Sequence, residues 1–142
     1  MNATQPDTSA TMSREYAGEA ATLRTARRDV VNWLMECGAD SHTIERASLI
    51  TSELASNAIH AAPGQPYQLR VSAVEPNAAS LSIRNRTSSG GPPPRADWRP
   101  VDELAIRGRG LSIVESLSDE VTVETDGDEV IVTAWFRMIS SC

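Results

Sequence analysis

The sequence predicts an α/β fold, a two-layer sandwich with helices on one face of a mixed, mostly antiparallel sheet. Segments with helical apolar spacing and segments that alternate apolar and polar residues follow one another as strand, helix, helix, strand, strand, loop, helix, strand, strand. The chain has 142 residues, of which 40% are hydrophobic, and this suits one domain around one core.

The N-terminal part of the chain changes from polar to periodic. Residues 1–12 contain too few apolar side chains to offset the entropy lost on ordering, so we expect a mobile tail there and a single domain over 13–142. A short extended segment is expected around 13–17. Apolar residues then recur with helical spacing over 19–37, and Gly38 is expected to end this helix.

A second helix and two strands are expected next. Ser41 is expected to cap the N-terminus of a helix over 42–61, because a serine hydroxyl can accept from the free backbone N–H groups of the first turn. A Pro-Gly pair follows this helix. Apolar and polar residues then alternate over 67–74 and 80–85 around a turn-like Glu-Pro-Asn, which predicts two neighbouring antiparallel strands.

The last third of the chain begins with a change of composition. Residues 86–107 are rich in Gly, Pro and Ser, and such a long loop in a compact domain is typical of a flexible lid or a disordered linker. We expect a lid. A short helix from 108 to about 117 and two strands over 120–125 and 129–137 follow, and an Asp-Gly-Asp turn joins these strands.

Charge and composition exclude several classes of function. The net charge is −6 and the pI is about 4.9, which disfavours nucleic acid as a partner, because phosphate binding needs clustered Lys and Arg. Cys37 and Cys142 form no disulfide framework and lack the neighbours of a zinc site. No apolar stretch is long enough to cross a membrane, and residues 1–10 do not resemble an export signal, so we expect a cytoplasmic protein.

Three polar residues of the second helix form one stripe. Glu53 and Asn57 are four residues apart and His60 follows three residues later, so their side chains lie along the same side of the helix. Leu54 and Ala58 fall on a different side, which can pack on the sheet. The stripe can face one ligand, but Glu and Asn are also commonplace on solvated helix faces, so spacing alone leaves both interpretations open.

A second polar feature is Gly108-Arg109-Gly110-Leu111 at the expected start of a helix. Helix N-termini offer free N–H groups and a positive dipole end, and glycines allow a phosphate to approach the backbone closely. A glycine hinge between loop and helix is the alternative. The feature is not a dinucleotide-binding motif, because no strand leads into it and a third glycine is absent, and the chain has no P-loop.

Five sequence features occur in one fixed order: Glu53-Leu-Ala-Ser-Asn57-Ala-Ile-His60-Ala61, Ile83-Arg-Asn85, a Pro-rich segment, Gly108-Arg-Gly-Leu111 and Thr133-Ala-Trp135. In this combination the chain resembles the small GHKL-type, or histidine-kinase-like, ATP-binding proteins of bacteria, especially their anti-sigma-factor serine/threonine kinase branch. The resemblance runs from about Ser13 to Met138. It implies a Bergerat-type ATP-binding fold and ATP and Mg²⁺ as ligands.

The resemblance also implies roles for individual residues. Glu53 matches the general base, which takes a proton from a serine hydroxyl or water, and Asn57 matches the magnesium ligand. A carboxylate and an amide oxygen suit these tasks, since Mg²⁺ prefers oxygen ligands. The remaining nucleotide contacts are implied at His60, Ala61, Asn85, Gly108, Arg109, Gly110, Leu111 and Thr133. Arg109 could equally be an exposed arginine, and Thr133 an ordinary strand threonine.

Asn85 departs from the family pattern, which has an aspartate that accepts a hydrogen bond from the adenine amino group. An amide oxygen can also accept, but it lacks the charge, and the amide presents donors on its other arm. The resemblance alone therefore predicts that Asn85→Asp tightens ATP binding.

For the whole chain the resemblance implies an anti-sigma factor that phosphorylates an anti-sigma-factor antagonist, binds a sigma factor and forms a homodimer. The first alternative is a partner-binding module of the same fold that catalyses weakly or not at all, and the second is an unrelated α/β domain. The presence of both Glu53 and Asn57 favours an enzyme, because a structural domain has no chemical need for that pair.

Overall fold

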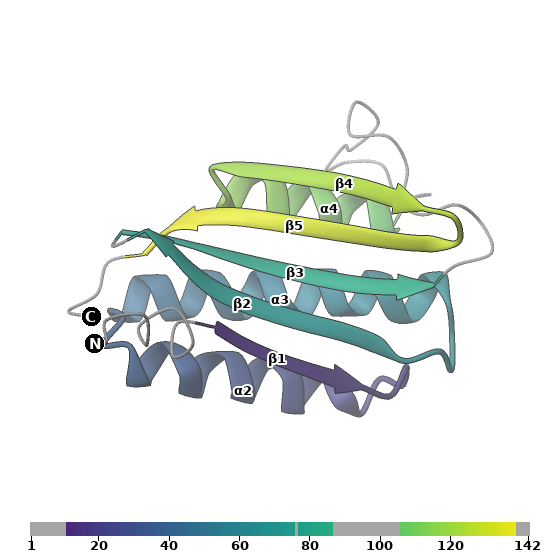
Figure 1. Cartoon of the computed structure of the whole chain (residues 1–142), viewed down its shortest axis with the longest axis horizontal. Helices are drawn as coiled ribbons and strands as arrows, with labels where there is room; N and C mark the ends of the chain where they lie inside the picture. Colours follow the sequence, from purple (N-terminus) through teal and green to yellow (C-terminus); the bar gives the residue numbers. More distant parts are fainter. Residues whose placement is uncertain (1–10, 76, 87–105, 139–142) are drawn as a thin grey trace, which may run out of the picture.

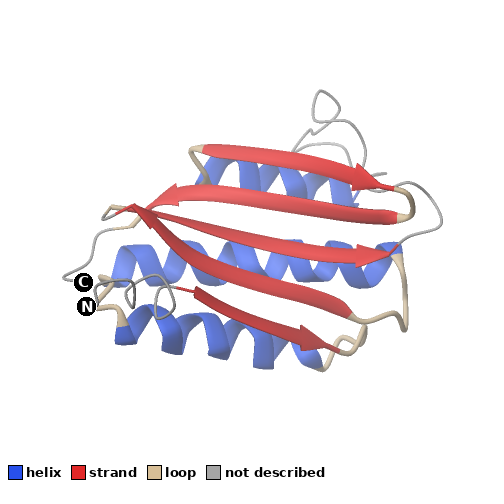
Figure 2. Ribbon diagram, viewed as in Figure 1, coloured by secondary structure: helices blue, strands red, loops and turns tan. Residues whose placement is uncertain are grey.

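The structure is a computed structural model of the chain, and it describes residues 11–75, 77–86 and 106–138. Helices pack on one face of a five-stranded sheet, so the predicted two-layer α/β sandwich is confirmed (Figure 1, Figure 2). Of the expected tail (1–12), residues 1–10 lie outside the described residues, and so do residues 87–105 of the expected lid (86–107). The ends of both segments belong instead to β1, β3 and α4. The elements are β1 (Thr11–Tyr16), α2 (Thr22–Glu36), α3 (Ser41–Ala61), β2 (Tyr67–Glu75), β3 (Ala78–Arg86), α4 (Ile106–Leu117), β4 (Glu120–Asp126) and β5 (Glu129–Arg137).

The sheet has the strand order β1-β2-β3-β5-β4. Its four strand pairings are all antiparallel, so no mixed pairing occurs in the described part of the chain. The β4–β5 hairpin turns at Gly127, whose φ of 65° is in the left-handed region that favours glycine in two-residue turns. β3 and β5 lie side by side at the centre although α4 and β4 separate them in the sequence (Figure 1).

Alternation along the strands separates a covered sheet face from an open one. On β3, Leu81, Ile83 and Asn85 are buried toward the helices, whereas Arg84 and Arg86, which alternate with them, are exposed on the other face. The buried residues of β2 and β5 continue this covered face. Together with the apolar sides of α2 and α3 they form a single core.

Both long helices differ from the sequence expectation at their N-termini. α2 begins at Thr22 and not at residue 19, because the Thr22 hydroxyl donates to the carbonyl oxygen of Glu19 (2.8 Å) and closes a turn there. The N-cap of α3 is Asp40 and not Ser41. Asp40 has an extended backbone and its carboxylate accepts from the Thr43 N–H (2.9 Å), whereas Ser41 is already helical.

Two contacts fix the end of the first strand, one to the helical layer and one to the neighbouring strand. The Tyr16 hydroxyl donates to Asp29 of α2 (2.6 Å), and the ring of Tyr16 stacks on Tyr67 of β2. Burial and the neighbouring Asp29 carboxylate raise the pKa of Tyr16, so its hydroxyl stays protonated as a donor. Strand β1 begins at Thr11, two residues earlier than expected.

The loops after β1 and after α3 touch at Gly18. The Gly64 N–H donates to the Gly18 carbonyl (3.0 Å), and a β-carbon at residue 18 would lie 2.1 Å from the carbonyl oxygen of Gln65. Only glycine fits there without a backbone shift. The loop that ends α3 is therefore held against the loop that follows β1.

None of the helices over the described ranges is long and apolar enough to cross a membrane. The longest is α3, with 21 residues, and it carries charged and polar side chains along its length.

We expect Asp40→Ala to lower the thermal stability of the protein, because it removes the N-cap acceptor of α3. The hydrogen bond from Thr43 lowers the pKa of Asp40, so its stabilising effect is full above the ordinary pKa of an aspartate and is lost as pH falls through the lowered pKa. Melting curves from pH 7 to pH 2 check this. Asp40→Asn keeps an acceptor and is the control, and equal losses in both variants would contradict the cap.

Candidate functional site

The side chains of α3 divide into three groups around its axis. Leu54 and Ala58 are buried against the sheet, as the sequence predicts. Ser52 lies on the side that faces α2, where Arg27 donates to its hydroxyl (3.2 Å). Successive helical residues are about 100° apart, so Glu53 and Asn57 lie about 100° and about 140° around from Ser52, toward the side where α4 packs.

Glu53 is half-buried in this position. Burial raises the pKa of its carboxyl group above the ordinary value for a glutamate, and no other cause contributes visibly. No hydrogen bond or ion pair to its side chain occurs within the described residues. The carboxyl group is thus partly removed from water without receiving a partner in exchange, and this is typical of a group that acts on a ligand.

Asn57 lies one turn further along the same side of α3. Its amide nitrogen Nδ2 is buried and has no hydrogen-bond partner in the described part of the chain. A buried amide without a partner costs stability, since its hydrogen bonds to water are lost. The side chain therefore has a free donor beside its oxygen, and a ligand with an acceptor atom at this side of α3 would supply the missing partner.

His60 differs from the other two residues of the predicted stripe. It is exposed, and its Nδ1 donates to the backbone oxygen of Ser56 one turn earlier (2.8 Å). Its ring is thus engaged on its own helix. At about 100° per residue, His60 lies within about 20° of Glu53 around the helix axis, so it stays on the same side of α3. Ala61, also predicted to bind nucleotide, is the last residue of α3 and is half-buried.

Asn85 connects the end of β3 to the end of α3. It is only 8% exposed, and its Nδ2 donates to the carbonyl oxygens of Ala58 (3.4 Å) and Arg86 (3.3 Å). In the sheet register Asn85 pairs with Val130 of β5, which is also buried. Asn85 thus lies in the covered layer near the C-terminal end of α3.

Thr133 does not share this location. It pairs with Ser82 of β3 and Thr122 of β4, and its neighbours Val132 and Ala134 are the residues buried under the helices. Because side chains alternate between faces, Thr133 lies on the open face, away from Asn85. The residue of β5 beside Asn85 is Val130, which the sequence analysis did not identify. Only the register between β3 and β5 places Val130 beside Asn85, and this register cannot be read from a single sequence.

The predicted glycine motif lies inside α4. The helix begins at Ile106, so Gly108 and Gly110 fall in its first two turns and not ahead of it. Arg109 and Leu111 belong to the same turns. α4 packs beside α3 and begins at the end of the molecule where β3 and α3 end (Figure 1). Glycine inside a helix costs roughly 0.5–1 kcal/mol relative to alanine, so close approach of a ligand or of another backbone is a reason for it here.

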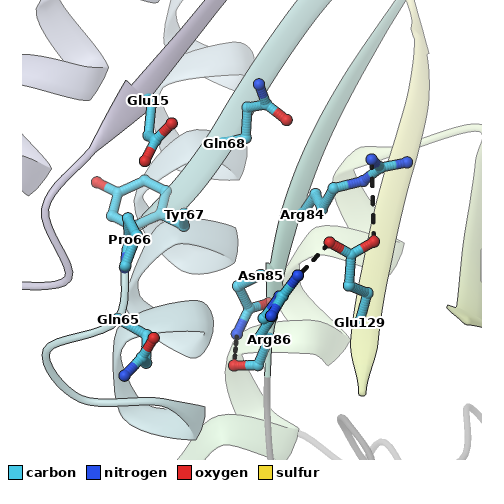
Figure 3. Close-up of a pocket in the computed structure, with 9 residues that line it drawn as sticks. All are labelled: Glu15, Gln65, Pro66, Tyr67, Gln68, Arg84, Asn85, Arg86 and Glu129. Atoms are coloured by element: carbon cyan, nitrogen blue, oxygen red, sulfur yellow. Dashed lines mark hydrogen bonds and ion pairs between the residues drawn. The ribbon is translucent and has the colours of Figure 1, made fainter. Parts of the chain in front are cut away.

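A pocket of about 170 Å³ lies at the sheet end beside Asn85 (Figure 3). Arg84 and Arg86 on its wall each lie 3.9 Å from the Glu129 carboxylate, and Glu15 closes another side. Ligand pockets usually exceed roughly 300 Å³, so this recess is too small for a nucleotide. No sequence motif predicts this pocket, because its lining residues come from β1, β2, β3, β5 and the loop before β2.

A magnesium site is compatible with these residues. No group of three or more His, Cys, Asp or Glu side chains that could hold a metal occurs in residues 11–75, 77–86 and 106–138. Mg²⁺ usually keeps several waters and binds through one or two protein oxygens plus substrate phosphates, so it needs no such cage. The oxygen of the Asn57 amide suits this mode and would hold the metal, and its unpaired buried nitrogen would donate to a phosphate oxygen.

Comparison with known proteins identifies the fold family. Residues 16–135 match the model of the histidine kinase-like ATPase domain, which covers most of the chain. No curated protein matches the sequence at a significant level.

Solved structures give a similar picture at low sequence identity. The RsbU and RsbW domains of Rv1364c from Mycobacterium tuberculosis match over 90% of this chain, with a TM-score of 0.64 and 19% identity. This chain spans only 32% of that protein's chain. The SiaB–SiaC complex from Pseudomonas aeruginosa matches over 89% of each chain, with a TM-score of 0.59 and 13% identity. These likenesses show a shared fold.

We expect Glu53→Gln to stabilise the unliganded protein at pH 7. The raised pKa means that the ionised carboxylate is disfavoured in the folded state, so the wild type loses stability as pH rises, and the gain in the variant disappears at pH below the ordinary glutamate pKa. Urea unfolding at pH 4 and pH 7 measures the difference. Glu45→Gln, at an exposed position two turns earlier on α3, is the control. An equal effect in both variants would show that Glu53 is not desolvated.

Proposed function

The chain belongs to the histidine kinase-like ATPase domain family, and from this premise we propose that it binds Mg-ATP and acts as an anti-sigma factor with serine/threonine kinase activity toward an anti-sigma-factor antagonist. In this proposal it works in the cytoplasm, binds a sigma factor and forms a homodimer. The structural likeness to a protein with an RsbW domain and to SiaB supports the choice of branch within the family.

The observation that carries the proposal is a pair of polar side chains on one side of α3 that are partly removed from water and lack hydrogen-bond partners in the described residues. Glu53 has a raised pKa, and Asn57 has a buried amide nitrogen without a partner. Both face the side where α4 packs, and the first two turns of α4 contain two glycines. A structural role would leave this desolvation uncompensated, whereas a bound metal-phosphate group compensates it.

In the proposed reaction the residues of this chain position the reactants. Glu53 accepts the proton of the attacking serine hydroxyl, and its raised pKa brings it closer to the operating pH of a general base. The backbone N–H groups at the start of α4 bind phosphate oxygens with the help of the helix dipole. The oxygen of Asn57 would hold Mg²⁺, which would supply positive charge against the phosphates.

A second candidate is a partner-binding module of the same fold without efficient catalysis. The observation that favours it is the absence of a charged side chain where the family resemblance implies an aspartate that contacts adenine. That position holds Asn85, which pairs with Val130, and neither residue carries a charge. Weak nucleotide binding would fit such a module. Phosphotransfer activity separates the two candidates.

We expect the purified chain to bind ATP in a Mg²⁺-dependent manner, and Asn57→Ala to weaken Mg-ATP binding by roughly tenfold or more, since a metal contact is lost. Asn57→Ala should not lower the thermal stability through lost hydrogen bonds, because the amide nitrogen of Asn57 has no partner in the described structure. Calorimetric titration with and without Mg²⁺ tests this. The control is Asn32→Ala on the exposed side of α2. A flat titration of the wild type up to millimolar ATP would reject the proposed function.

For catalysis we expect Glu53→Gln to keep Mg-ATP binding within about threefold and to reduce phosphotransfer by roughly 10² or more, as for loss of a general base. The assay uses ATP labelled at the γ-phosphate and the antagonist protein that co-purifies with the chain from its native cells. Glu45→Gln should transfer phosphate like the wild type. Undiminished transfer by Glu53→Gln would place the base elsewhere, and absence of transfer in a wild type that binds ATP would favour the binding module.

A further inference from the structure

We propose that the pocket at the end of the sheet binds a small zwitterion, a molecule with a carboxylate at one end and an ammonium group at the other. Its charged lining residues are Glu15, Arg84, Arg86 and Glu129, and the proposed reaction uses none of them. The strand register places all four on the open face of the sheet, whereas Glu53 lies in the helical layer on the covered face. The inference is therefore independent of nucleotide binding.

The first argument is a set of unused donors on the wall that β3 forms. Arg84 and Arg86 are alternate residues of this strand, so their side chains leave the same face roughly 7 Å apart. Each guanidinium lies 3.9 Å from the Glu129 carboxylate, which is too far for a hydrogen bond, and neither donates to another side chain or carbonyl within the described residues. A guanidinium has five N–H donors in a fork that matches a carboxylate. The two arginines can thus bind the carboxylate of a ligand.

The second argument is the distribution of charge around the pocket. Glu129 neutralises one of the two guanidinium charges, so this wall keeps one positive charge. Glu15 supplies a negative charge from β1, and its carboxylate has no ion pair or hydrogen bond in the described part of the chain. Figure 3 shows Glu15 and the two arginines on opposite sides of the pocket, with Gln68 between them. A neutral ligand with two charged ends complements both sides.

The register of the strands sets the length of this ligand. Glu15 pairs with Gln68 and Gln68 pairs with Arg84, so the three residues form one row across β1, β2 and β3. Neighbouring strands are about 4.8 Å apart, which places the backbones at Glu15 and Arg84 roughly 10 Å apart. A ligand whose charged groups are several bonds apart spans this gap better than an α-amino acid, whose two charged groups share one carbon atom. We therefore expect an ω-amino acid, of which 4-aminobutyrate is a simple example.

The uncharged part of the lining is held in place without a ligand. Gln65 and Pro66 belong to the loop before β2, and the Gln65 N–H donates to the carbonyl oxygen of Ala62 (3.0 Å). Tyr67 is buried, and its hydroxyl forms a hydrogen bond with that of Thr22 (2.8 Å). A preorganised site loses less free energy when a ligand binds. The volume of about 170 Å³ suits a small molecule of this kind.

Three ligands of nearly the same shape test the inference, because 4-aminobutyrate carries both charges, butyrate only the carboxylate and butylamine only the ammonium group. In calorimetric titrations of the full chain we expect 4-aminobutyrate to bind at least tenfold more tightly than either of the others, since each of these leaves one side of the pocket unpaired. A smaller preference, or a flat titration with 4-aminobutyrate up to tens of millimolar, would overturn the inference.

Two substitutions assign the ends of the ligand. Glu15→Gln should lower the affinity for 4-aminobutyrate to about that for butyrate and leave butyrate binding unchanged, whereas Arg84→Gln should weaken the binding of both by roughly tenfold. Arg70→Gln is the matched control, because Arg70 is exposed on the same face but does not line the pocket. It should bind 4-aminobutyrate like the wild type. Equal losses in Arg84→Gln and Arg70→Gln would show a general effect of charge and would also overturn the inference. Melting curves check that all three variants are folded.

Discussion

Coverage of only one face of the sheet is the constraint from which the rest of this structure follows. The helices bury every second residue of β2, β3 and β5, so a one-residue change of register would exchange the residues that face the helices with those on the open face. Asn85 and Val130 lie on the covered side, and Thr133 lies on the open side. Because α3 packs on the covered face, buried residues occupy its sheet-facing side. Its polar pair, Glu53 and Asn57, lies on the flank next to α4.

The candidate site therefore depends on how the ends of three elements are joined. Asn85 links β3 to α3 through its hydrogen bond to the carbonyl oxygen of Ala58, and a second hydrogen bond to the carbonyl oxygen of Arg86 holds its amide within β3. α4 reaches the same end of the molecule from the other side. Desolvation at Glu53 and the unpaired nitrogen of Asn57 lower the stability of the unliganded protein, a cost often found where a protein binds its ligand. Binding and stability are in this way connected through the same few side chains.

Much of the fold could be predicted from the sequence because it depends on periodicity. The alternation on β3 and the apolar side of α3 gave the layers, and most element boundaries agree within two residues. The caps were less predictable, since Asp40 and Ser41 are both good N-cap residues and only backbone geometry separates them. The hydrogen bond of the His60 ring to the carbonyl oxygen of Ser56 could not be predicted, because it depends on the side-chain rotamer. Val130 could not be found from the sequence, since strand register is set by contacts between β3 and β5.

The contact at Gly18 has a mechanical consequence. The backbones of the β1–α2 loop and the α3–β2 loop meet with no room for a side chain between them, so neither loop can be displaced without moving the other. β1 is an edge strand, and its outer backbone groups pair with no other described strand. A force applied at that edge is transmitted through Gly18 and Gln65 to the last turn of α3, where Asn85 is attached. The edge strand β1 and the C-terminal end of α3 are thus coupled through this backbone contact.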